Sequence, residues 1–289
     1  MTLHGYSTAL FATWWFVEEH GLLFDCGDGL TAALLQRARK VKHVFLSHAD
    51  RDHLTGLLQF LQLNAREGFP VIYYPRDCGS FRALAEFSAR FDPHVSGVKW
   101  VPVEEGMPIR IGELLVEPVR NGHVVAPPDQ VKSLSYRVWS VRRKLKAEYA
   151  HLSGNELRDL SQAHGKDHLT DELRVSLLDY SGDTPVENPV RYKGSKLLIH
   201  EATFLAGDAD TAVEARGNRH STLEEVMAMV AANSPGALVL GHFSARYSAE
   251  VIDRRIRELC GKYGIRFPVH RVLPGATCFD VLAEPPISG

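Results

Sequence analysis

Short apolar runs alternate with longer amphipathic stretches along most of the chain. Runs typical of strands lie at 13–17, 21–25, 43–47 and 71–74, and stretches with helical periodicity lie at 30–39, 54–66 and 80–90. The interval 98–119 is again rich in strand-type sequence. Because strands, loops and helices repeat in this order, the pattern predicts an α/β protein whose sheets carry helices on their outer faces.

Side chains that can bind a metal ion crowd together where the strand 43–47 ends and the helix 54–66 begins. They belong to the segment His48-Ala-Asp50-Arg-Asp52-His53. The strand and the helix fix the backbone on either side of this loop, so residues 48, 50 and 52 can converge. Imidazole and carboxylate groups together suit zinc, manganese or iron, whereas calcium and magnesium take oxygen ligands almost exclusively. The alternative for an aspartate here is a cap on the following helix.

Further polar residues of the same types follow four other strand-like runs. They are His123 after 114–119, Asp183 after 175–180, His200 and Glu201 after 196–199, and His242 after 237–240. A single histidine after a strand is more often a satisfied edge or core residue than a ligand. Because the arrangement recurs, we expect these strand ends to share one cleft at the same edge of the sheets.

Composition narrows the class of protein. The chain has 289 residues, of which 45% are hydrophobic, and a formal net charge of −2, which indicates a globular protein without a global attraction to nucleic acid. Its four cysteines form no paired motif, which favours a reducing compartment, by default the cytoplasm. The start of the chain lacks the features of a signal peptide, and no apolar run reaches 18 residues, so we expect no membrane span.

The ordered set of motifs resembles the metallo-β-lactamase superfamily and, within it, the ribonuclease Z branch of tRNA 3′-end processing endonucleases. After the first metal motif these are Asn121-Gly-His123, Ser181-Gly-Asp183-Thr, His200-Glu201-Ala-Thr-Phe204, His220-Ser-Thr and Gly241-His242-Phe-Ser-Ala-Arg-Tyr247. The resemblance implies a four-layer αβ/βα metallo-β-lactamase sandwich, here one domain spanning 1–289 with an insert at about 142–174. It also implies a site for two divalent metal ions, with zinc expected.

The resemblance also assigns roles to individual residues. One metal ion would be held by His48, Asp50 and His123, the other by Asp52, His53 and His242, with Asp183 bridging them. Asp52 would orient or deprotonate the attacking water. Glu201 and His220 would assist departure of the 3′ oxygen, because a histidine oriented by a carboxylate can act as a general acid near pH 7. A homodimer, in which the arm of one subunit serves the cleft of the other, is implied as well.

Two features depart from the family pattern. The position that is usually His is Asp50 here, and a harder oxygen donor makes manganese or iron suitable beside zinc. The insert 142–174 contains no proline, unlike the Gly-Pro exosite of the tRNA-processing enzymes, and begins with a basic run at 142–146. That run is either a phosphate contact or a solvated face.

Three functions remain open at this stage. The first is a metal-dependent phosphodiesterase or endoribonuclease, in which a hydroxide held by two metal ions attacks an RNA or nucleotide phosphodiester. The second is a hydrolase of a small molecule, such as a cyclic nucleotide, ester, thioester or lactone, which the lack of a Gly-Pro exosite favours. The third, which the complete ligand set argues against, is a non-catalytic metal-binding module.

Overall fold

Two β-sheets stacked face to face form the centre of the molecule, shown by a computed structural model that describes residues 1–188, 190–205 and 219–288. The first sheet has the order β1-β2-β3-β4-β5-β6. Its strands are β1 (Leu3–Thr8), β2 (Ala12–Val17), β3 (Leu22–Phe24), β4 (His43–Phe45), β5 (Val71–Pro75) and β6 (Lys99–Val103). β1 to β3 form an antiparallel meander, and β3 to β6 are parallel.

The second sheet has the order β13-β12-β11-β10-β9-β8-β7. Its strands are β7 (Ile109–Ile111), β8 (Leu114–Arg120), β9 (Leu134–Leu145), β10 (Thr170–Tyr180), β11 (Leu198–Glu201), β12 (Leu238–Gly241) and β13 (Val269–Arg271). β7 to β10 are antiparallel and β10 to β13 are parallel, so each sheet joins an antiparallel half to a parallel half.

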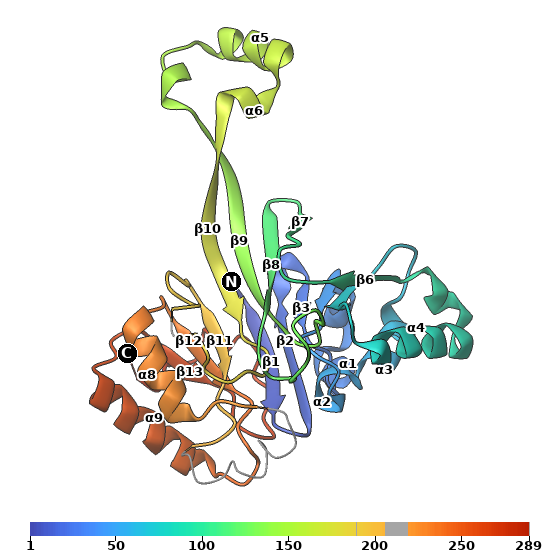
Figure 1. Cartoon of the computed structure of the whole chain (residues 1–289), viewed down its shortest axis with the longest axis vertical. Helices are drawn as coiled ribbons and strands as arrows, with labels where there is room; N and C mark the ends of the chain where they lie inside the picture. Colours follow the sequence, from blue (N-terminus) through green and yellow to red (C-terminus); the bar gives the residue numbers. More distant parts are fainter. Residues whose placement is uncertain (189, 206–218, 289) are drawn as a thin grey trace.

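Helices cover the outer face of each sheet (Figure 1). The first sheet carries α1 (Leu30–Leu34), α2 (Arg51–Leu54), α3 (Leu57–Asn64), α4 (Gly79–Phe91) and the 3-10 helices η1 (Glu18–His20), η2 (Leu35–Lys40) and η3 (Pro93–Gly97). The second sheet carries α8 (Leu223–Asn233) and α9 (Ala249–Tyr263). The predicted αβ/βα sandwich is therefore confirmed. Among the described residues, no helix is both long and apolar enough to span a membrane.

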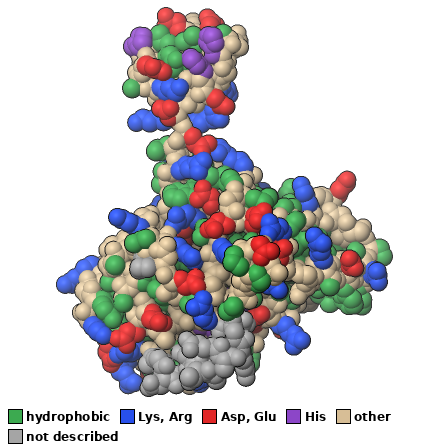
Figure 2. Space-filling view, in the orientation of Figure 1, with side chains coloured by type: hydrophobic (Ala, Val, Ile, Leu, Met, Phe, Trp, Pro, Cys, Tyr) green, Lys and Arg blue, Asp and Glu red, His purple; other side chains and the backbone are tan. Residues whose placement is uncertain are grey.

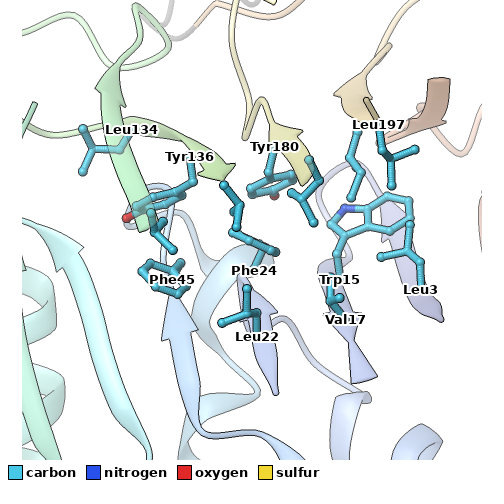
Figure 3. Packing of buried hydrophobic residues seen from close by; sticks show 14 of the residues in the cluster. Leu3, Trp15, Val17, Leu22, Phe24, Phe45, Leu134, Tyr136, Tyr180 and Leu197 are labelled. Carbon is cyan, nitrogen blue, oxygen red and sulfur yellow. The ribbon is translucent and has the colours of Figure 1, made fainter. Parts of the chain in front are cut away.

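Aromatic side chains fill the space between the two sheets (Figure 3). Phe24 and Phe45 from the first sheet pack against Tyr136 from the second, with ring centroids 5.2 to 6.2 Å apart. Trp15 lies farther along the same layer and is almost fully buried. Large buried aromatic side chains contribute strongly to stability. They also fix the distance between the loops that follow the strands of either sheet.

The insert predicted at 142–174 forms a projecting arm (Figure 1). β9 and β10 run beyond the body as a two-stranded ribbon, and the tip holds η4 (Ala147–Tyr149), α5 (Gly154–His164) and α6 (Lys166–Leu169). None of the residues of α5 is buried. The insert lacks the Gly-Pro element, but it forms a ribbon with a helical tip that extends from the body.

Ion pairs engage Arg143 in the basic run at the start of the arm and Arg174 on the opposite strand. Arg143 pairs with Asp167, whereas Arg142 and Lys144 are exposed. Arg174, on the other strand, contacts Glu117 and Glu172. Lys and Arg side chains alternate with acidic ones at the neck of the arm (Figure 2).

Candidate active site

The strand ends that carry polar residues meet at one edge of the sandwich. The loop after β4 brings His48 to His53, and the loops after β8, β10 and β12 bring His123, Asp183 and His242. Ligand atoms of His48, His123 and Asp183 all lie within 4.8 Å of one another, as do those of Asp52, His53 and His242. The strand ends expected to meet at one edge therefore do so. A third group within the same distance joins Asp183, His220 and His242.

The first group has unpaired imidazole nitrogens at its centre. Nε2 of His48 and Nε2 of His123 are buried and have no hydrogen-bond partner among the described residues. Buried polar atoms are nearly always paired, so two such atoms aimed at one point fit an ion as their partner. Asp50 Oδ2 lies 3.7 Å from His48 Nε2 and 3.6 Å from His123 Nε2, and Asp183 Oδ2 lies 3.8 Å from His48 Nε2.

Asp50 occupies the N-cap position of α2, where the alternative interpretation placed it as a helix cap. Its backbone is extended there, but its side chain makes no capping hydrogen bond. The carboxylate faces the two imidazoles instead. The geometry therefore favours a ligand role over a cap.

The second group shares Asp183 with the first. Asp183 Oδ2 lies 3.2 Å from His53 Nε2 and 3.3 Å from His242 Nε2. Asp52 Oδ2 lies 3.6 Å from His53 Nε2 and 3.4 Å from His242 Nε2. A carboxylate placed between two sets of imidazoles can bridge two metal ions.

Charge in the site favours ionised carboxylates. Burial opposes ionisation of Asp183, but the imidazoles of His242 and His53 outweigh it and hold the pKa of Asp183 well below its usual range. The neighbouring imidazoles of His123 and His48 lower the pKa of Asp50 and outweigh the opposing effect of burial. Ionised carboxylates are the form that binds a metal ion.

Each histidine of the two groups is held through Nδ1, so that Nε2 faces the centre. The partners are Ser47 Oγ for His48, Asp25 Oδ2 for His53, the Arg219 carbonyl for His123 and Thr203 Oγ1 for His242, at 2.7 to 2.9 Å. Such outer contacts set the tautomer and the orientation of metal-binding imidazoles.

Asp25 is the supporting residue that sequence reasoning missed. It is fully buried and accepts hydrogen bonds from the backbone N–H and the hydroxyl of Ser47, at 2.7 Å each, and from the hydroxyl of Tyr180. It thereby joins the loop after β4 to the end of β10. The only sequence signal is its place between the end of a buried strand and Gly27. A Cβ on Gly27 would lie 2.3 Å from the Asp52 carbonyl oxygen, which explains the glycine.

Glu201 and His220 form a second pair beside Asp183. His220 Nδ1 lies 3.1 Å from Glu201 Oε1 and 3.8 Å from Asp183 Oδ2. Glu201 is held by the backbone N–H of Thr184 and the hydroxyl of Thr203. Burial disfavours the charged imidazole, but the carboxylates of Glu201 and Asp183 prevail and raise the pKa of His220 to about 9. The imidazolium can therefore act as a general acid at neutral pH.

His200 is the strand-end residue that the structure does not bring into the cluster. Its Nδ1 lies 2.7 Å from the carbonyl oxygen of Glu201, and its ring packs edge-on against Tyr192. Burial lowers the pKa of His200, which keeps it neutral. It belongs to the packing behind the site.

The sequence of this chain is similar to a known protein family and to characterised relatives. A model of the beta-lactamase superfamily domain matches residues 20–150. Ribonuclease Z of Ignicoccus hospitalis is 31% identical over 261 residues, which cover 83% of this chain and 83% of that protein. The chloroplastic tRNase Z TRZ2 of Arabidopsis thaliana is 26% identical over 269 residues, covering 90% and 72%.

Solved structures show the same fold. The metallo-β-lactamase-fold protein YhfI from Bacillus subtilis superposes with a TM-score of 0.63 at 16% identity, covering 96% of this chain and 100% of that one. The fold expected from the sequence motifs is therefore confirmed.

Proposed function

Because the chain belongs to the ribonuclease Z family of metallo-β-lactamase-fold hydrolases, we propose that it is the endoribonuclease that removes the 3′ trailer from precursor tRNA. The observation that carries this proposal is the position of His220. Its Nδ1 is paired with Glu201 and lies 3.8 Å from Asp183, the carboxylate shared by both groups of ligand atoms. A proton donor thus lies directly beside the candidate metal centre, where a nucleotide leaving group would need it.

The ligand set fits two divalent metal ions. The residues that would hold them are His48, Asp50 and His123 for one, Asp52, His53 and His242 for the other, and Asp183 for both. Mixed nitrogen and oxygen ligands suit zinc, and the carboxylate at position 50 also suits manganese or iron. Bound ions would supply an activated water and neutralise charge on the phosphate.

The chain's own residues supply the proton transfers. Asp52 has a pKa lowered, against the effect of burial, by His53 and His242, so its carboxylate is ionised and can orient the attacking water. Glu201 engages Nδ1 of His220, so Nε2 is the nitrogen that can protonate the leaving 3′ oxygen. The residue that orients the water and the residue that protonates the leaving group therefore come from different loops.

Cleavage of precursor tRNA with and without added zinc or manganese tests the proposal. We expect a mature 3′ end that carries a free hydroxyl. His220→Ala should lower the rate on RNA about 10²- to 10⁴-fold, the usual contribution of a general acid. The hydrolysis rate of the same variant on bis(p-nitrophenyl) phosphate should fall far less, because nitrophenolate leaves without needing a proton. Turnover of a cyclic nucleotide, thioester or lactone without cleavage of precursor tRNA would instead establish the small-molecule alternative.

We further propose RNA as the partner, a homodimer as the assembly and the cytoplasm as the compartment. Zinc is the ion that the family resemblance implies for the site, whereas the carboxylate of Asp50 favours manganese or iron for activity. The support for a reducing compartment is that all four cysteines are free, three of them buried.

A further inference from the structure

The turn between β1 and β2 presents two apolar side chains to solvent. Leu10 is 84% exposed and Phe11 is 63% exposed, whereas Ala9 and Ala12 on either side are buried. Single exposed apolar residues are common on protein surfaces and need no explanation. Two successive exposed apolar residues, in a turn held beside the candidate active site, do need an explanation.

The turn is anchored to the site through its backbone. The N–H of Leu10 donates to Asp52 Oδ2 at 3.0 Å, and Leu10 adopts a left-handed conformation with φ of 70°. The N–H of Ala9 donates to the carbonyl of Phe243, the residue after His242. A non-glycine residue held at positive φ is uncommon and is often found at functional sites. The backbone of the turn is therefore anchored to the candidate ligand Asp52 and to the segment that follows His242.

The turn lies on the side of the site that holds Asp52. Asp52 contacts Nε2 of His242, whereas His220 stacks on the face of the same ring, with centroids 5.5 Å apart. If His220 protonates the 3′ oxygen of the upstream nucleotide, that nucleotide lies beside His220. The nucleotide that keeps the phosphate then lies toward Asp52 and the turn.

We infer that Leu10 and Phe11 form a platform on which the nucleobase 3′ to the scissile phosphate stacks. The inference rests on the proposed endoribonuclease function and specifies one of its substrate contacts. Stacking on an aromatic ring is available to every base, so the platform would hold trailers of any sequence. Arg246, exposed on the segment that follows His242, adds positive charge for the backbone of the strand.

The test compares Phe11→Ala and Phe11→Trp on two RNAs, one intact and one abasic at the first nucleotide after the cleavage point. On intact RNA, Phe11→Ala should raise KM about five-fold or more, as expected for loss of one stacked base, while Phe11→Trp stays close to wild type. On the abasic RNA, wild type should already show the higher KM, and Phe11→Ala should add little. Phe87→Ala removes a 52% exposed aromatic side chain from α4 and serves as the matched control, without effect on either RNA.

Each outcome separates the platform from the proposed function. Equal losses by Phe11→Ala on intact and abasic RNA would overturn the platform, because the side chain would then act without the base. An unchanged KM of Phe11→Ala on intact RNA would overturn it as well and leave the endoribonuclease function standing. A wild-type protein that cleaves neither RNA, with metal present, would overturn both.

Discussion

Asp50 carries a carboxylate where the family usually has an imidazole, and this change bears on which metal ion the candidate site would bind. The side chain is 45% exposed, reaches both imidazoles of the first ligand group and makes no capping bond to α2. A harder donor with an added negative charge favours manganese or iron over zinc. We expect higher RNA-cleaving activity with manganese than with zinc in the wild type, and a shift toward zinc in Asp50→His.

Metal titrations of both proteins, followed by calorimetry and by activity, check this expectation. Asp50→Asn is the matched control, since it keeps the size of the side chain and removes the charge. If all three proteins showed the same order of metal preference, the carboxylate would have no part in the metal centre.

His220 sets an expected upper pH limit for the reaction. The raised pKa of about 9 means that the imidazolium persists at neutral pH and is lost as the pH rises through that value. A general acid is active only while protonated, so kcat/KM for RNA should fall above about pH 9. Glu201→Gln removes the charge that stabilises the imidazolium most, so the descending limb should move to lower pH. Profiles of kcat/KM against pH at saturating metal measure the descending limb of the wild type and of Glu201→Gln. If the limb of the variant stayed where it is in the wild type, the limb would belong to a group other than His220.

The arm is the element most separable from the catalytic body. Leu145 and Thr170 are paired across β9 and β10, so residues 146–169 can be replaced by Asn-Gly, which suits a two-residue hairpin turn. Because α5 buries no side chain, the shortened protein should fold and retain hydrolysis of bis(p-nitrophenyl) phosphate. Its KM for precursor tRNA should rise about ten-fold or more if the arm contacts several phosphates.

Salt dependence provides the internal control for that experiment. The shortened protein should show a shallower loss of RNA affinity with increasing salt, because fewer phosphate contacts release fewer counterions. An unchanged KM and an unchanged salt slope would show that the arm does not contact RNA.

Elements that bury a regular apolar pattern could be predicted from the sequence, and those that depend on distant contacts could not. β1 was missed because polar residues and Gly5 interrupt its pattern. Yet a Cβ at Gly5 would lie 2.3 Å from the ring of Trp15, so packing across the sheet requires the interruption. The helix predicted at 30–39 ends early, at Leu34, because Leu35 has a φ of 48° and the chain continues as η2. The helix predicted at 54–66 is likewise split, since Gly56 packs against the backbone of Gly27.

The same distinction holds for the candidate site. Local spacing was enough to pick out residues whose ligand atoms the structure brings together, because the loops that carry them follow apolar strands. The role of Asp25 could not be found in this way, since its partners Ser47 and Tyr180 lie 22 and 155 positions away. Nor could the direction of His200, whose neighbouring Glu201 faces the cleft while His200 packs against Tyr192.

The shape of the whole molecule bears on its assembly. The arm and the β1–β2 turn lie at opposite ends of the molecule in Figure 1, and the 11 residues of β10 alone span about 35 Å. An arm placed there is better suited to hold RNA bound to another subunit than RNA in its own cleft. We therefore expect a homodimer, measured by light scattering at micromolar concentration. A monomer at that concentration, with wild-type activity on precursor tRNA, would show that the arm serves its own cleft.

The placement of the ligands on both sheets gives the metal centre a mechanical role. Asp52 and His53 follow the first sheet and His242 follows the second, and the two histidines are 189 positions apart in the chain. An ion held by both would link the two halves of the sandwich. Anything that binds only the folded state stabilises it, here by about 1.4 kcal/mol for each tenfold rise in free metal above Kd. Chelation should therefore lower the melting temperature as well as the activity, so that metal supply would set the fraction of the chain that is folded.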